Sequence, residues 1–160
     1  MKEIKMTRGF GAIVDDEDFE ELSKHRWYCD SRGYAVRKLA RDGGRQKALY
    51  VHIAILGNTE GLEIDHINGN PLDNRRENLR HVTHQQNIHN RKPVGASSQY
   101  KGVCWYKRDC RWLARIVLDG KRTHLGYYKL EMDAARAYNE AARVMFGEYA
   151  RLNVMPIFNN

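Results

Sequence analysis

The sequence predicts an α+β chain of two modules: a strand–loop–strand–helix unit, then a three-stranded antiparallel sheet packed on one helix. Three observations carry this prediction. Pro, Gly and Ser cluster within residues 90–98, where the composition changes on either side. Residues 97–153 combine aromatic and β-branched runs with one segment of helical period. Asp119-Gly120, between two such runs, is a strong hairpin signal.

The N-terminal part is predicted to hold several short elements. They are a strand at 9–14, a helix from the acidic run 15–18 to Leu22, and strands at 27–29 and 34–36 joined by the turn Asp30-Ser31-Arg32-Gly33. Residues 49–56 are apolar and fit either a strand or a helix. Within them, His52 is interpreted as a packed or surface histidine rather than a ligand.

The C-terminal part has clearer periodicity. Strands are predicted at 100–106, 111–118 and 122–128, and a helix at 131–146. The apolar side chains at helical spacing are Ala134, Ala135, Tyr138, Ala141, Ala142 and Met145, and Gly147 follows as a stop. The small alanines let the helix lie close to the sheet. Trp112 and Tyr128 are interpreted as core packing.

The net charge of the chain is concentrated in one stretch. Lys and Arg number 27 against 20 Asp and Glu, a formal charge of +7. Residues 93–130 hold 8 basic and 2 acidic side chains, whereas residues 56–92 hold 5 of each. Aromatic residues are interleaved with the basic ones, a pattern expected of a nucleic-acid surface. A solvated basic face is the open alternative.

Composition also excludes several classes of protein. No apolar run approaches the ~20 residues of a membrane span, and the N-terminus lacks the pattern of a secretion signal. Cys29, Cys104 and Cys110 form neither an even set nor a C-x-x-C pair. A disulfide scaffold and a cysteine-based zinc site are therefore not expected. We expect a cytoplasmic protein, in the host cell if the chain is phage-encoded.

A cluster of polar residues marks residues 64–91. Residues 64–70 form the end of a strand and a turn, and residues 78–83 supply its partner strand. Thr83 and Gln86 fit a capping box, which predicts a short helix over about 84–91. This strand–loop–strand–helix unit presents Asp65, His66 and Asn87.

These three side chains suit hydrolysis of a phosphodiester. Carboxylate and amide oxygens, as in Asp65 and Asn87, are ligands for Mg²⁺, which keeps waters and binds phosphate oxygens. His66, with an ordinary pKa near ~6.5, can take a proton from water. One base and one metal supply the chemistry of the reaction. Successive strand residues point to opposite faces, so Asp65 and His66 share a site only where the strand twists or ends.

The segment Asp65-His66-Ile67-Asn68-Gly69-Asn70-Pro71-Leu72-Asp73-Asn74-Arg75-Arg76-Glu77-Asn78-Leu79-Arg80, with Thr83 and Asn87, resembles the phage-type H-N-H homing endonucleases. The resemblance covers about residues 48–91 and implies the ββα-metal nuclease fold. It implies His66 as general base, with Asn78 as the asparagine that ties the hairpin together. It also implies one Mg²⁺ or Mn²⁺ ion on Asp65 and Asn87, with His89 a less favoured substitute. The zinc-binding cysteine pairs of some relatives are missing, so no structural zinc is implied.

Residues 98–153 resemble the APETALA-two (ethylene-response-factor) DNA-binding domain. Five segments carry the resemblance: Tyr100-Lys101-Gly102-Val103, Trp112-Leu113-Ala114-Arg115-Ile116, His124-Leu125-Gly126-Tyr127-Tyr128, Ala134-Ala135-Arg136-Ala137-Tyr138 and Ala150-Arg151-Leu152-Asn153. That family lays its sheet in the major groove. The positions that this implies for DNA contact are Lys101, Arg108, Arg115, Arg122 and His124. Charge and stacking capacity add Trp105, Lys107, Arg111 and Lys121.

Together the patterns predict a metal-dependent DNA endonuclease of the homing type. Residues 1–92 form the nuclease module, with its ββα-metal core at about 62–91, and residues 97–153 form the DNA-reading module. Double-stranded DNA is the expected partner, with no membrane, and a monomer is favoured. The alternative is a non-enzymatic DNA-binding regulator with a degenerate nuclease site. A third interpretation is a nuclease of general host defence or packaging.

Overall fold

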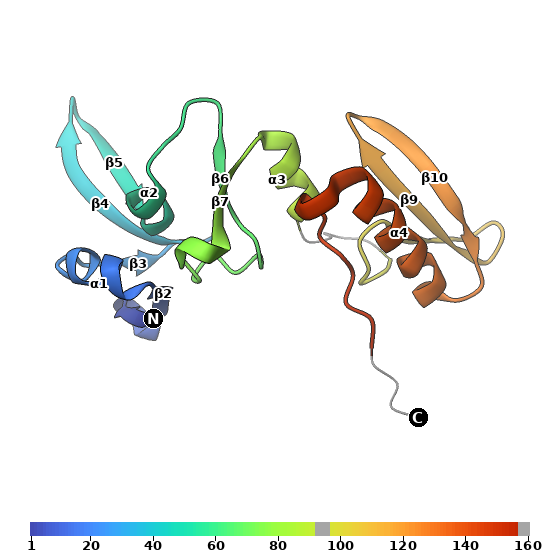
Figure 1. The fold of residues 1–160 in the computed structure, drawn as a ribbon, viewed down its shortest axis with the longest axis horizontal. Helices are drawn as coiled ribbons and strands as arrows, with labels where there is room; N and C mark the ends of the chain where they lie inside the picture. Colours follow the sequence, from blue (N-terminus) through green and yellow to red (C-terminus); the bar gives the residue numbers. More distant parts are fainter. Residues whose placement is uncertain (92–96, 157–160) are drawn as a thin grey trace. The chain divides into compact units, whose positions relative to one another are not determined.

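The computed structural model describes residues 1–91 and 97–156, which divide into two compact units. The N-terminal unit is Met1–His84 and the C-terminal unit is Gln85–Asn160. The elements of the N-terminal unit (Figure 1) are β1 (Lys2–Lys5), η1 (Thr7–Gly9), β2 (Gly11–Val14), α1 (Asp16–Ser23), β3 (Tyr28–Cys29), β4 (Ala35–Asp42), β5 (Arg45–Tyr50), α2 (Val51–Leu56), β6 (Glu63–His66), η2 (Arg76–Asn78) and β7 (Leu79–Val82). Those after β7 are α3 (His84–Asn90), β8 (Val103–Tyr106), β9 (Arg111–Leu118), β10 (Lys121–Tyr128), α4 (Glu131–Phe146) and η3 (Gly147–Tyr149).

The N-terminal unit contains three small antiparallel sheets, β1-β2, β3-β4-β5 and β6-β7. Its core is centred on Trp27, whose side chain is fully buried together with Val14 and Val51. The Trp27 indole N–H donates to the Leu22 carbonyl at 2.7 Å, because a buried indole needs a hydrogen-bond acceptor. The core thus fixes the end of α1 against the sheets.

Most N-terminal predictions are confirmed, with two strands missed. The strand at 9–14, the helix after the acidic run and the hairpin of β3 and β4 are present. β1 is missed because Ile4 is the only apolar residue in Lys-Glu-Ile-Lys. β5 is missed too. β4 is longer than predicted, extends to Asp42, and pairs with β5. The ambiguous stretch 49–56 divides, the strand ending at Tyr50 and α2 following directly.

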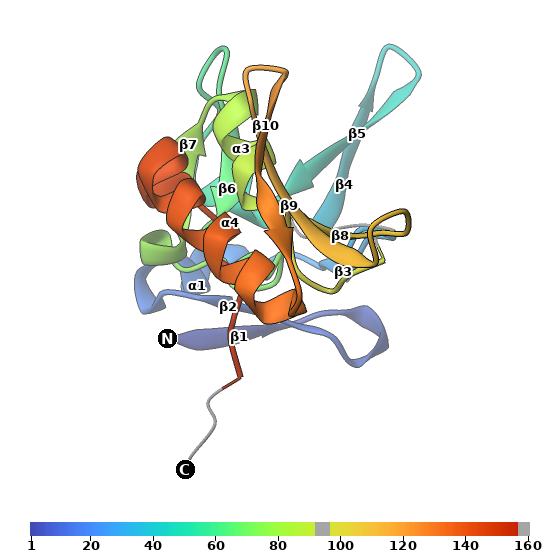
Figure 2. The same ribbon diagram turned by 90° about the vertical axis from the view of Figure 1, so that its right-hand side faces the viewer.

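The C-terminal unit is a three-stranded antiparallel sheet with α4 across one face (Figure 2). The buried residues of α4 are Ala134, Ala135, Tyr138, Asn139, Ala142 and Phe146. Against them pack Val103, Ala114 and Ile116 of the sheet, with Trp112 and Tyr128 partly buried beside them. The α+β class and the sheet on one helix are confirmed.

Two glycines carry the local geometry of this sheet. Asp119 and Gly120 have φ of 51° and 73°, the positive pair that a type I′ hairpin turn requires. Gly102 has φ of +76°, and an added Cβ would come within 2.0 Å of the Tyr138 ring. Only glycine lets the segment before β8 lie against α4 there.

The division into compact units falls inside the predicted nuclease module. That module is predicted to run through residue 92, and α3 from Gln85 onward packs in the C-terminal unit. The reason is packing: the His89 ring stacks on Phe146 with centroids 3.8 Å apart. Residues 92–96 of the predicted linker lie outside the described residues. In residues 1–91 and 97–156, every helix is too short or too polar to cross a membrane.

Candidate functional site

Asp65 and His66 are the last two residues of β6, and both are buried. In the β6–β7 register, Asp65 lies opposite Arg80 and His66 lies opposite Leu79. Neighbouring side chains in a strand point to opposite faces, so Asp65 and His66 can serve one site only where the strand ends. The strand does end at His66.

His66 is held by a buried asparagine. Its Nε2 lies 3.2 Å from Oδ1 of Asn74, whose Nδ2 donates to the Pro71 carbonyl at 3.4 Å. The amide oxygen therefore faces the ring and Nε2–H donates, so in neutral imidazole Nδ1 bears the lone pair. Burial lowers the pKa of His66, while the Asn74 hydrogen bond and the charges of Asp65 and Asp73 oppose this. A neutral ring with a defined tautomer is suited to accept a proton near neutral pH.

Two other rings lie against His66. His52 is edge-on to it with centroids 5.2 Å apart, and Tyr34 lies at 5.7 Å. Tyr50 stacks on His52 at 5.4 Å. Burial and the nearby His66 lower the pKa of His52 to about 4. The interpretation of His52 as a packed histidine is confirmed. The contacts of Tyr34, Tyr50 and His52 around His66 were not predicted, because these rings come from separate segments of the chain.

Asp65 makes a buried ion pair. Nε and Nη2 of Arg80 donate to its Oδ2 at 3.1 and 2.9 Å, and both side chains are largely buried. Arg80 is not among the site residues predicted from the sequence. Its signal was the hairpin register, because cross-strand neighbours of opposite charge pair on one face.

Asn78 ties together the loop that follows β6. Its Nδ2 donates to the Asp73 carbonyl at 2.7 Å and its Oδ1 accepts from the Asn68 N–H at 3.0 Å. The carboxylate of Asp73 accepts from Arg75 and Asn68, and the Arg75 bonds lower the pKa of Asp73. The loop also docks on β2, where the Asn74 N–H donates to the Ile13 carbonyl at 2.8 Å. This network makes the support of His66 rigid.

The candidate metal donors are oxygen atoms. Asp65 belongs to the N-terminal unit and Asn87 lies on α3 in the C-terminal unit. Among residues 1–91 and 97–156, no three His, Cys, Asp or Glu side chains gather as a metal cluster. One carboxylate and one amide oxygen fit Mg²⁺ or Mn²⁺, which keep several waters, better than a soft ion.

The sheet of the C-terminal unit has an outer face, opposite α4, and by register four of the predicted DNA contacts lie on it: Arg111, Arg115, Arg122 and His124. Arg115 lies opposite His124, and Arg122 lies opposite Val117. The predicted residues that are exposed on or beside this sheet are Trp105, Lys107, Arg108, Arg111, Lys121, Arg122 and His124.

Two tyrosines, absent from the predicted set, join these residues on the outer face. Tyr127 lies 4.7 Å from the His124 ring and 5.2 Å from Tyr106, and the guanidinium of Arg108 lies 5.6 Å from the Tyr106 ring. A shift of register between His124 and Gly126 brings Tyr127 onto this face, which a strict two-residue period does not foresee.

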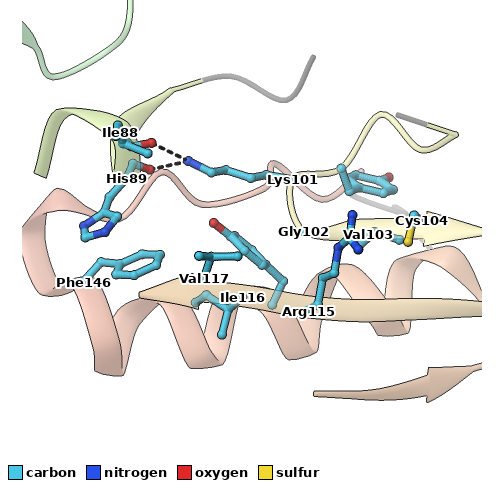
Figure 3. Close-up of a pocket in the computed structure, with 12 residues that line it drawn as sticks. Ile88, His89, Lys101, Gly102, Val103, Cys104, Arg115, Ile116, Val117 and Phe146 are labelled. Atoms are coloured by element: carbon cyan, nitrogen blue, oxygen red, sulfur yellow. Dashed lines mark hydrogen bonds between the residues drawn. The ribbon is translucent and has the colours of Figure 1, made fainter. Parts of the chain in front are cut away.

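Three predicted DNA contacts lie elsewhere. Lys121 lies opposite Leu118, which packs on the α4 side of the sheet. Trp105 pairs with Trp112, on the face of the sheet that packs against α4, and the two rings meet at 5.0 Å. Lys101 precedes β8, and its ammonium donates to the carbonyls of Ile88 and His89 (Figure 3) and to that of Arg91. Trp105 therefore packs on Trp112, and Lys101 binds carbonyls at the C-terminal end of α3.

Comparisons with known proteins find relatives for both parts of the chain. The C-terminal region is similar to APETALA2-like protein 2 of Oryza sativa, 43% identical over 63 residues, which are 39% of this chain and 14% of the relative. Protein 3.8 of Escherichia phage T7 is 33% identical over 93 residues, covering 58% of this chain and 76% of the relative.

Two further matches concern the HNH endonucleases. The HNH endonuclease family model matches residues 51–89. Uncharacterized HNH endonuclease L560 of Acanthamoeba polyphaga mimivirus is 32% identical over 149 residues, which are 91% of this chain and 76% of the relative. A match of this extent includes both units, and the chain belongs to the HNH endonuclease family.

Proposed function

We propose that this HNH endonuclease cleaves double-stranded DNA with a divalent metal ion, as a homing-type enzyme whose target is placed by the C-terminal sheet. The observation that carries the proposal is the position of His66, which is buried at the end of β6 with its Nε2 3.2 Å from Oδ1 of Asn74. Membership of the HNH endonuclease family supports the reaction class.

In this mechanism His66 is the general base. Its Nδ1 takes a proton from the attacking water, while Nε2–H stays bonded to Asn74. Asp65 and Asn87 would hold the ion through their oxygens, and a bound divalent ion would supply neutralisation of the negative charge that develops during phosphodiester hydrolysis. Arg80 orients the Asp65 carboxylate by donating twice to its Oδ2.

The outer face of the sheet is the proposed DNA-binding surface. Arg115, Arg122 and His124 supply donors, and Tyr106 and Tyr127 supply stacking area on the same face. Similarity to APETALA2-like protein 2 supports a DNA-binding role for this unit. A β-sheet of this kind can read bases in the major groove.

The test is cleavage of phage-scale DNA by the full chain in Mg²⁺, with the ends mapped on both strands. We expect cuts at few positions, abolished by chelator and by His66→Ala. The variant His25→Ala, which removes another histidine of the same unit, is the matched control and should cut normally. Tight, site-selective binding without any cut, in Mg²⁺ or Mn²⁺, would instead identify a DNA-binding regulator.

A further inference from the structure

We infer that Lys101 is a positioning residue for Asn87: it caps the C-terminus of α3, and the C-terminal unit thereby holds the helix that supplies the metal ligand. This inference rests on the proposed function, in which Asn87 binds the metal. It replaces the DNA contact expected of Lys101 from sequence with a role in the cleavage site.

The first support is the set of acceptors around the Lys101 ammonium. Its Nζ donates to the carbonyls of Ile88, at 3.3 Å, and of His89 (Figure 3), and to the carbonyl of Arg91 at 2.9 Å. The last carbonyls of a helix lack partners within it and carry the negative end of its dipole. A lysine placed there satisfies several of them at once.

The second support is the burial of Lys101. Burial and the neighbouring charges of Arg151 and Arg91 lower its pKa to about 8. A lysine withdrawn from solvent in this way is poorly placed to meet DNA phosphate. The carbonyls of α3 compensate the loss of its hydration.

The third support is that the backbone of Lys101 is itself clamped. Its N–H donates to Oδ1 of Asn153 at 2.7 Å, and Nδ2 of Asn153 donates back to its carbonyl at 3.1 Å. Asn139 of α4 holds Asn153 through two further bonds, at 2.7 and 2.9 Å. Gly102 then lies directly against Tyr138. The lysine therefore projects from a fixed point of the C-terminal unit.

A separate contact holds the same end of α3. The His89 ring stacks on Phe146 at 3.8 Å, at an interplanar angle of 12° (Figure 3). The Arg151 N–H donates to the His89 carbonyl at 3.4 Å. α3 has only seven residues, too few to be stable alone. Its order, and with it the placement of Asn87, depends on these contacts.

The experiment compares Lys101→Met in the full chain with Lys129→Met, which removes an exposed lysine of the same unit. Three quantities are measured: amide hydrogen exchange of α3, DNA affinity as a function of salt, and the Mg²⁺ concentration giving half-maximal cleavage. For Lys101→Met we expect α3 exchange faster by about tenfold, an unchanged salt dependence, and a several-fold higher Mg²⁺ requirement. Lys129→Met should leave α3 exchange and the Mg²⁺ requirement at wild-type values.

Unchanged α3 exchange in Lys101→Met overturns the inference. So does weaker DNA binding with a salt slope reduced by about one, which is the mark of a lost phosphate contact. If Lys101→Met does not fold, Lys101→Gln replaces it, because its shorter amide keeps the side chain polar but loses the ammonium that donates to these carbonyls. Asn87→Ala separates the two levels of failure. If it leaves the Mg²⁺ requirement unchanged, the ligand assignment is wrong; if it raises the requirement and Lys101→Met does not, the positioning role is wrong.

Discussion

The rings of His52 and His66 meet edge-on with centroids 5.2 Å apart, although one lies on α2 and the other ends β6. Both are buried, and burial lowers the pKa of each. Nδ1 of His52 is buried without a hydrogen-bond partner among the described residues. His52 thus places an uncharged ring beside His66 near neutral pH.

The first prediction concerns acid stability. The pKa of His52 is about 4 in the folded chain and near ~6.5 when unfolded. Between these values the unfolded state binds the proton and the folded state does not, so stability falls as pH falls from about 6.5 to 4. The loss through this group reaches about 3 kcal/mol at pH 4.

Urea unfolding at several pH values, followed by the NMR signal of the Trp27 indole N–H, measures this dependence. His52→Phe keeps a ring but does not titrate, and its N-terminal unit should lose clearly less stability on acidification. Equal acid sensitivity in His52→Phe and wild type would contradict the assignment of this cost to His52.

The second prediction concerns the pair of Asp65 and Arg80. Arg80→Ala leaves a buried carboxylate without its cation and should destabilise the N-terminal unit by about 3 kcal/mol. The exposed pair of Lys24 and Glu21 offers the control, because Lys24→Ala should cost less than about 1 kcal/mol. The urea midpoints of Arg80→Ala and Lys24→Ala compare the two losses of stability. Equal midpoints would show that burial does not strengthen the pair of Asp65 and Arg80.

The third prediction separates the two faces of the C-terminal sheet. Tyr127→Ala removes a ring from the outer face and should weaken DNA binding, by about 1–3 kcal/mol if a base stacks on it. Trp105→Ala removes a ring that packs on Trp112 and should lower the melting temperature of this unit more than its DNA affinity. Melting curves and binding isotherms at matched salt compare the variants. The opposite pattern would place the DNA on the α4 side.

Sequence periodicity was sufficient where one local signal fixed one element. Asp119-Gly120 predicted its hairpin because both residues must adopt positive φ, and the alanine spacing predicted the buried face of α4. The register shift after His124 was not predictable, because a bulge breaks the period of two. Because of this shift, the sequence period does not predict that Tyr127 lies on the outer face.

The candidate site was predictable in its motif but not in its supports. Asp65, His66 and Asn78 follow from their order in the chain and from the resemblance. The docking of the loop on β2 brings Asn74 to the site, and the register of β6 and β7 brings Arg80. The position of α2 brings His52. Such contacts join residues distant in sequence, and their side chains have no local signature.

The most direct test of the central claim is the single-turnover cleavage rate of His66→Ala in saturating Mg²⁺ and DNA, measured beside its DNA affinity. A general base contributes ~10²–10⁴-fold to the rate. We therefore predict a loss of that size, with DNA affinity and folding close to wild type, because the proposed DNA surface lies in the other unit. A folded His66→Ala that cleaves at a near-normal rate would contradict the assignment of His66 as the base.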